Sequence, residues 1–159
     1  MGEQTATRSA SIETRATLAC RLRRRIGSHG APSTAGEVEV ENLSRGVIEI
    51  EAAIHPLQYL NLEVTDAAGE VVPAVPYGHI FSPRERASVL RLAPGEKYIH
   101  NVSLLGTVPA EKLLPGVYTV RAVYEYNGLR AVSEPVQVQV PPRTGIPNEP
   151  ALLLVLPLA

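Results

Sequence analysis

From Glu37 onward, apolar and polar residues alternate along the chain. Residues 37–41 read Glu-Val-Glu-Val-Glu, which places Val38 and Val40 on one face of a β-strand and three glutamates on the other. Later segments repeat this period of two, and turn residues separate them. The pattern therefore predicts strands with one buried face and requires no long helix.

Further alternating segments predict strands, and the turns between them carry specific signals. Asn127-Gly128 is the strongest hairpin signal in the chain, and Asp66 begins a second hairpin that ends at Gly69. The Pro-Gly turn at residues 93–96 is expected to pair the strands on either side of it. Seven or eight short antiparallel strands at this spacing predict an all-β sandwich. The expected segments are 37–41, 47–54, 59–66, 71–72, 88–92, 97–103, 116–126 and 129–140.

The chain divides by composition into four parts. We expect a disordered basic tail at residues 1–36, the β-sandwich domain at 37–141, a linker at 142–150 and an apolar segment at 151–159. No convincing strand precedes Glu37, so one edge of the sandwich is expected to be vacant.

Charge is distributed unevenly between the tail and the body. Residues 1–36 hold six arginines against two glutamates, whereas the remainder holds nine basic and fourteen acidic residues. An acidic body is a poor partner for nucleic acid. The cluster from Arg21 to Arg25 suggests binding to nucleic acid or to an anionic membrane, or a short basic helix over residues 14–26. A solvated, disordered tail is the preferred interpretation.

Most catalytic and metal-binding patterns are missing from the sequence. One cysteine, Cys20, excludes an internal disulfide and a zinc site of several thiolates, and Asp66 is the only aspartate. No pair of histidines has metal-ligand spacing, and there is no Gly-rich phosphate loop or nucleophile motif. No apolar run reaches the roughly 18 residues of a membrane-spanning helix. We expect no enzyme activity, no cofactor, no metal and no membrane span.

Two segments near the carboxyl end resemble the last two strands of a fibronectin type III or related immunoglobulin-like domain. They are Leu-Pro-Gly-Val-Tyr-Thr-Val at residues 114–120 and Ser-Glu-Pro-Val-Gln-Val at 133–138. The resemblance implies that Tyr118 folds back to form a hydrogen bond with the chain a few residues upstream. The fold expected from this is an antiparallel immunoglobulin-like β-sandwich.

A longer segment, residues 64–140, is similar to bacterial intracellular proteinase inhibitors and to accessory β-sandwich modules of bacterial surface proteins. The shared features are the D-x-x-G hairpin, the L-x-P-G-E turn at residues 92–96 and a P-G-x-Y-x-V strand. The resemblance covers about half the chain, and its motifs specify a fold rather than an activity.

The loop at residues 73–87 is the candidate protein-binding site. Proline interrupts it too often for a central strand, yet it combines aromatic residues with arginine, as binding hot spots do. Alternatively, Tyr77 and Phe81 cap the open end of the sandwich as part of the core. The candidate contact residues are Tyr77, His79, Phe81, Arg84 and Arg86.

The apolar segment 151–159 is too short to cross a bilayer as a helix. We expect it to add a strand to a sandwich edge, in its own subunit or in a neighbouring one, and a membrane or sorting segment is the rival interpretation. Self-association would then use Leu152, Leu153, Leu154, Val155 and Leu156.

These observations predict a non-catalytic binding or structural module with an unidentified protein partner. The runner-up is a proteinase inhibitor of the bacterial intracellular type, and an accessory domain of an enzyme is third. No secretory signal is visible, which favours the cytoplasm by default and an extracytoplasmic location if the amino terminus is incomplete.

Overall fold

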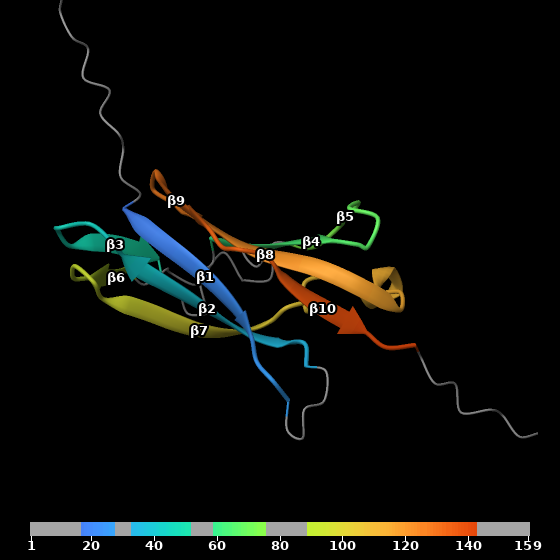
Figure 1. Ribbon diagram of the computed structural model, residues 1–159. Coiled ribbons are helices and arrows are strands. Elements are labelled where there is room, and N and C mark those ends of the chain that lie inside the picture. Colours follow the sequence, from blue (N-terminus) through green and yellow to red (C-terminus); the bar gives the residue numbers. More distant parts are fainter. Residues whose placement is uncertain (1–16, 28–32, 52–58, 76–88, 143–159) are drawn as a thin grey trace, which may run out of the picture.

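The computed structural model describes residues 17–27, 33–51, 59–75 and 89–142 (Figure 1). These residues form ten strands and one short 3₁₀ helix, Ala110–Lys112. Every strand pair is antiparallel. The chain is therefore an all-β protein of antiparallel sheets, as its alternation predicts.

Three sheets account for all ten strands. The three-stranded sheet has the order β1 (Leu18–Arg24), β2 (Ala35–Asn42), β7 (Lys97–Ser103). The five-stranded sheet has the order β10 (Val136–Val140), β8 (Gly116–Tyr126), β4 (Leu60–Thr65), β5 (Val71–Val72). In the same sheet, β9 (Leu129–Val132) also pairs with β8. The two-stranded sheet joins β3 (Ile48–Glu51) to β6 (Val89–Leu92).

One apolar core lies between the sheets, which gives the molecule its sandwich-like arrangement. The three-stranded sheet contributes every second residue of β1 and β2, and the five-stranded sheet contributes alternate residues of β4 and β8. The inward positions predicted for the strands that correspond to β2, β4 and β8 are buried, beginning with Val38 and Val40. The buried residues include Val38, Val40, Ile50, Leu60, Leu62, Val64, Tyr118, Val120, Ala122 and Tyr124.

The predicted tail at residues 1–36 is wrong for its described part, because β1 belongs to the sandwich. Leu18, Cys20 and Leu22 alternate and are buried against the core, and β1 pairs with β2 along its whole length. Burying these three side chains favours a strand over the short basic helix expected for residues 14–26. β1 also occupies the edge beside β2 that was expected to be vacant.

The pairing around the 93–96 turn also differs from the prediction. β6 and β7 do not pair with each other, because β6 pairs with β3 and β7 with β2. Backbone hydrogen bonds from Asn42 N to Glu96 O (3.0 Å) and from Gly95 N to Asn42 O (2.8 Å) tie this turn to the end of β2. The chain therefore passes from one strand pair to the next at this point.

Asn42 is fully buried at that junction and its side chain joins two turns. The Asn42 amide group donates to the carbonyl oxygens of Gly46 (2.7 Å) and Leu92 (2.8 Å). The side-chain carbonyl oxygen of Asn42, Oδ1, accepts from the backbone N–H of Ser44 (2.8 Å). One side chain thus provides hydrogen bonds to the carbonyl groups of two separate turns where the ends of β2 and β6 meet.

The predicted hairpin at Asn127-Gly128 is confirmed, but the returning strand is interrupted. Both turn residues have positive φ, 46° at Asn127 and 79° at Gly128, as a tight two-residue hairpin requires. Val132 lies opposite Val123, whereas Val136 lies opposite Val120. Three residues therefore oppose two, which is a β-bulge and separates β9 from β10. This break and the additional β1 raise the number of strands to ten.

The hydrogen bond expected for Tyr118 is present. Its hydroxyl group accepts from the backbone N–H of Leu114 (2.9 Å) and donates to the carbonyl oxygen of the same residue (2.8 Å). The ring is buried in the core, so the contact fastens the segment before β8 to the sandwich.

Candidate functional site

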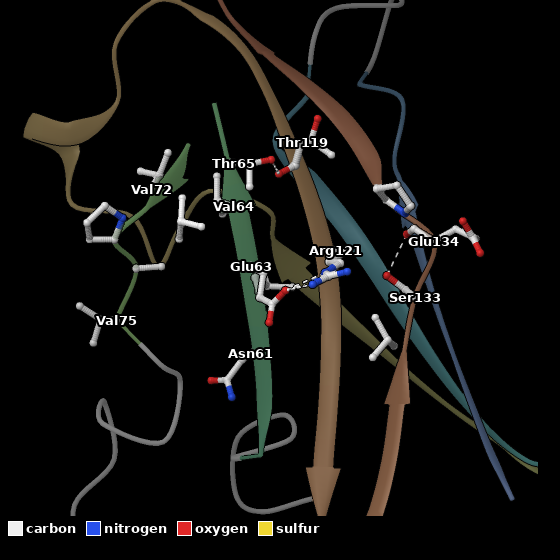
Figure 2. A pocket seen from close by; sticks show the side chains of 16 residues that line it. Asn61, Glu63, Val64, Thr65, Val72, Val75, Thr119, Arg121, Ser133 and Glu134 are labelled. Carbon is white, nitrogen blue, oxygen red and sulfur yellow. Dashed lines mark hydrogen bonds and ion pairs between the residues drawn. The ribbon is translucent and has the colours of Figure 1, made fainter. Parts of the chain in front are cut away.

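The outer face of the five-stranded sheet carries a row of polar side chains. On β4 they are Asn61, Glu63 and Thr65, which alternate with the buried residues of that strand. The strand register places Glu63 opposite Arg121 and Thr65 opposite Thr119 on β8. Alternate residues of paired strands point to the same face, so these side chains form neighbouring rungs (Figure 2).

Two walls convert this face into a groove of about 1160 Å³. One wall is β5 and the residues that follow it, up to Val75. The other is the bulge between β9 and β10, with Ser133, Glu134 and Pro135. Figure 2 shows the two walls on opposite sides of the Glu63–Arg121 pair. The volume exceeds the roughly 300–1,000 Å³ of a typical small-molecule site, which suits a longer ligand.

The Glu63–Arg121 ion pair forms the floor of the groove. Nε and Nη2 of Arg121 each lie 2.6 Å from the same carboxylate oxygen, Oε2 of Glu63. Both side chains are about half exposed, and an exposed pair of this kind contributes little to stability. The pair cancels its own charge, so the floor is polar but electrically neutral.

Exposed valines border the groove on both sides. Val71 is 76% exposed and Val75 is 44% exposed on the β5 wall, and Val132 on β9 is 37% exposed. Val71 lies opposite Thr65 and Val132 lies opposite Val123, both on the outer face. The apolar rims favour contact with an apolar extended ligand, and Glu134 on the bulge wall, beside the neutral Glu63–Arg121 pair, disfavours an anionic one.

Ser133 holds the bulge wall in place. The Ser133 hydroxyl group accepts from the backbone N–H of Ala122 (2.9 Å) and donates to the carbonyl oxygen of Glu134 (2.9 Å). The backbone N–H of Ser133 also donates to the carbonyl oxygen of Ala122 (2.9 Å). The side chain therefore replaces ladder hydrogen bonds that the extra residue displaces.

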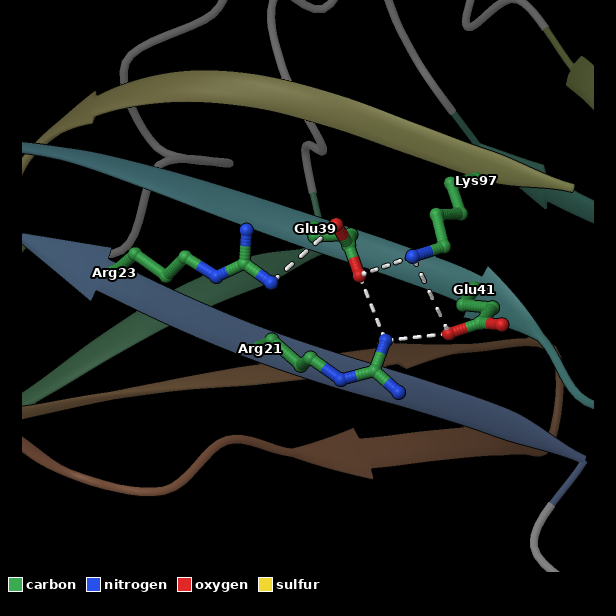
Figure 3. A network of polar contacts seen from close by, with 5 residues as sticks. All are labelled: Arg21, Arg23, Glu39, Glu41 and Lys97. Atoms are coloured by element: carbon green, nitrogen blue, oxygen red, sulfur yellow. Dashed lines mark hydrogen bonds and ion pairs between the residues drawn. The ribbon is translucent and has the colours of Figure 1, made fainter.

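The outer face of the three-stranded sheet has different chemistry, with a carboxylate between two basic strands (Figure 3). Glu39 on β2 is only 4% exposed, although it points away from the core. Its Oε1 lies 2.7 Å from Arg21 Nη1 and 3.2 Å from Lys97 Nζ. Arg21 also forms an ion pair with Glu41, and Arg23 Nη2 lies 3.9 Å from Glu39 Oε2.

This network changes the pKa values of its members. Burial acts to raise the pKa of Glu39. Hydrogen bonds from Arg21 and Lys97, together with the charges of Lys97 and Arg23, outweigh burial and hold the pKa of Glu39 below its usual 4.5. Hydrogen bonds to Glu41 and Glu39 raise the pKa of Arg21. Two arginines of the predicted basic cluster are thus engaged within the sheet, which weakens their case as an anion-binding surface.

The predicted contact residues lie outside the described part of the chain. Tyr77, His79, Phe81, Arg84 and Arg86 all fall within residues 76–88, and Leu152 to Leu156 fall within 143–159. The groove was not predicted, because its floor depends on the register that places Glu63 of β4 opposite Arg121 of β8. The signal in the sequence is the outward polar alternation of β4 alone.

The described residues meet neither the requirements of a metal site nor those of a membrane-spanning helix. No group of three or more His, Cys, Asp or Glu side chains is arranged to hold a metal ion there. No helix in the same residues is long and apolar enough to cross a membrane.

No protein-family model matches the chain, and no curated protein matches it significantly.

Proposed function

We propose that this chain is a non-catalytic, immunoglobulin-like binding module that holds an extended segment of a protein partner in the groove. The observation that carries the proposal is the groove itself, with a neutral Glu63–Arg121 floor between exposed valines. The exposed valines on both rims offer apolar contacts to an extended chain that lies between them.

The chemistry of the lining favours binding over catalysis. Its described side chains include one arginine, two glutamates, an asparagine, a serine and two threonines, without a histidine or cysteine to act as base or nucleophile. Ser133 makes two hydrogen bonds that hold the bulge, so its role in the groove is structural.

The predicted contact residues adjoin this groove along the chain. Val75 belongs to the groove wall, and Tyr77 and Phe81 follow it within six residues. In our proposal these aromatic residues extend the same binding surface. The hydrogen bond of Tyr118 to Leu114 supports the immunoglobulin-like assignment, because this contact is the one that the resemblance implies.

Selection from a random peptide library displayed on phage tests the proposal. The full chain is expected to enrich peptides that are rich in apolar residues, and Val71→Glu or Val132→Glu is expected to weaken their binding at least about tenfold by placing a charge on the rim. Ile99→Glu is the matched control, because Ile99 is 53% exposed on β7, in the other sheet.

Two results would contradict the proposal. One is a selection that enriches no peptide, and the other is enriched peptides that bind the rim variants and the wild type equally well. In a separate arm, Tyr77→Ala combined with Phe81→Ala reports whether the predicted contact residues belong to the surface. Unchanged binding in a folded double variant would remove them from it.

A further inference from the structure

The groove places strict demands on the segment that fills it. The Glu63–Arg121 pair neutralises its floor and Glu134 on the bulge wall adds a negative charge, so an anionic ligand gains no partner there and loses hydration. Its rims are Val71, Val75 and Val132, which offer apolar surface on both sides. An extended, apolar segment without acidic side chains suits this lining.

The chain itself contains such a segment. Residues 151–159 read Ala-Leu-Leu-Leu-Val-Leu-Pro-Leu-Ala, with no charged or hydrogen-bonding side chain. Such a segment is unfavourable in water unless it is buried. Nine residues in an extended conformation span about 30 Å, which is long enough to lie along several rungs of a sheet face.

The connection between β10 and this segment determines which copy it reaches. β10 ends at Val140, which pairs with Gly116, only three residues along β8 from the groove residue Thr119. The ten residues 141–150 include four prolines, and a proline-rich linker extends by about 3.1 Å per residue, or roughly 30 Å here. A spacer extended to that length would carry residues 151–159 past the adjacent groove of the same copy, which favours the groove of a second copy.

We propose that residues 151–159 of one copy occupy the outer groove of a second copy. The inference rests on the proposed function, since it uses the same groove, and it names a second copy of this chain as the partner. The contact joins two different surfaces, so after one contact one copy retains a free groove and the other retains a free apolar segment. Further contacts of this kind build rings or open chains, and two copies that exchange their segments reciprocally form a closed dimer.

Two variants of the full chain test the groove and the apolar segment separately. Val71→Asp damages the groove, and Leu153→Asp with Val155→Asp damages the segment. Light scattering after size-exclusion chromatography should give wild-type masses above 17.1 kDa that rise with concentration. Each variant alone should elute at the monomer mass, and Ile99→Asp, outside the groove, should behave as the wild type.

Mixing the two variants is the decisive step. The segment variant retains an intact groove and the groove variant retains an intact segment, so an equimolar mixture should form a one-to-one complex that neither forms alone. A mixture that stays monomeric overturns the inference. So does a wild type that is monomeric at every concentration, or a groove variant that assembles normally.

Circular dichroism and the unfolding midpoint check that each variant folds. Val132→Asp on the opposite rim replaces Val71→Asp if that variant is unstable. Peptides from the library that still bind a groove in a monomeric protein would show that the proposed function stands and that this inference has failed.

Discussion

Asn42 shows how one polar side chain can hold two turns together. Its side-chain amide donates hydrogen bonds to the carbonyl oxygens of Gly46 and Leu92. Its backbone N–H and C=O form hydrogen bonds with Glu96 and Gly95, so Asn42 contacts both the turn after β2 and the turn after β6. A buried amide with this many partners stabilises the fold mainly by leaving no carbonyl unpaired. Position 42 is therefore expected to tolerate few substitutions.

Replacing Asn42 by Ala should lower the free energy of unfolding by about 2–4 kcal/mol, because the buried Leu92 carbonyl oxygen loses the Asn42 amide and the Gly46 carbonyl oxygen keeps only the Ser44 hydroxyl group. Urea denaturation measures the change. Ser44→Ala is the matched control, with an expected loss of about 1 kcal/mol or less. An Asn42→Ala protein as stable as the control would show that the amide contacts do not hold the turns.

Glu39 makes the stability of the fold depend on acid. Its pKa is lowered in the native state, so its stabilising contribution is complete above pH 4.5 and is lost as the pH falls through the native-state value. The free energy of unfolding of the wild type should exceed that of Glu39→Gln at neutral pH, and the difference should shrink in acid. Denaturation curves from pH 7 downward measure this, and a difference that does not change with pH would contradict it.

At the scale of elements, β1 contributes to the apolar core although its sequence is rich in arginine. Its inward residues are Leu18, Cys20 and Leu22, and its outward arginines meet the glutamates of β2. Burial raises the pKa of Cys20 to about 11 from its usual 9.0. Cys20 is the only cysteine of the chain, so its reactivity reports whether β1 is docked.

Cys20 in the native protein should react with iodoacetamide at pH 8 about 100-fold more slowly than in urea, because the thiolate is the reacting form and its population falls with the higher pKa. Mass spectrometry over time measures the rate. Arg21→Ala should accelerate native labelling, since β1 then loses its ion pairs with β2. Equal rates in buffer and in urea would show that β1 is not docked.

The bulge is the second element with a specific dependence on one residue. Ser133→Ala should lower the free energy of unfolding by about 1–3 kcal/mol, because the backbone N–H of Ala122 loses its acceptor at a buried position. Ser133→Thr retains the hydroxyl group and should lose less. Thermal or urea unfolding compares the two, and an alanine variant equal to the wild type would contradict this role.

The sequence predicted most of these elements because alternation and turn residues act locally. Leu60, Leu62 and Val64 are buried as their spacing predicts, and the Asn127-Gly128 turn forms as its residues require. β1 escaped prediction because arginines interrupt its three apolar positions. The groove escaped prediction because its floor pairs Glu63 with Arg121, and only the register of β4 and β8 brings these distant residues together.

For the whole molecule, the two outer faces have different roles. The three-stranded sheet neutralises its charges in a network around Glu39, whereas the five-stranded sheet presents a groove with apolar rims. Binding in the groove is therefore expected to leave the Glu39 network unchanged. This difference gives an internal control for any experiment that locates a contact.

Amide chemical-shift mapping by NMR, on the full chain at increasing concentration, tests most directly whether copies meet through the groove. The expected shifts cluster at Thr65, Val71, Arg121 and Val132, together with residues of the segment 151–159, while Glu39 and Ile99 stay unchanged. Shifts centred on the three-stranded sheet, or none across the whole concentration range, would contradict assembly through the groove.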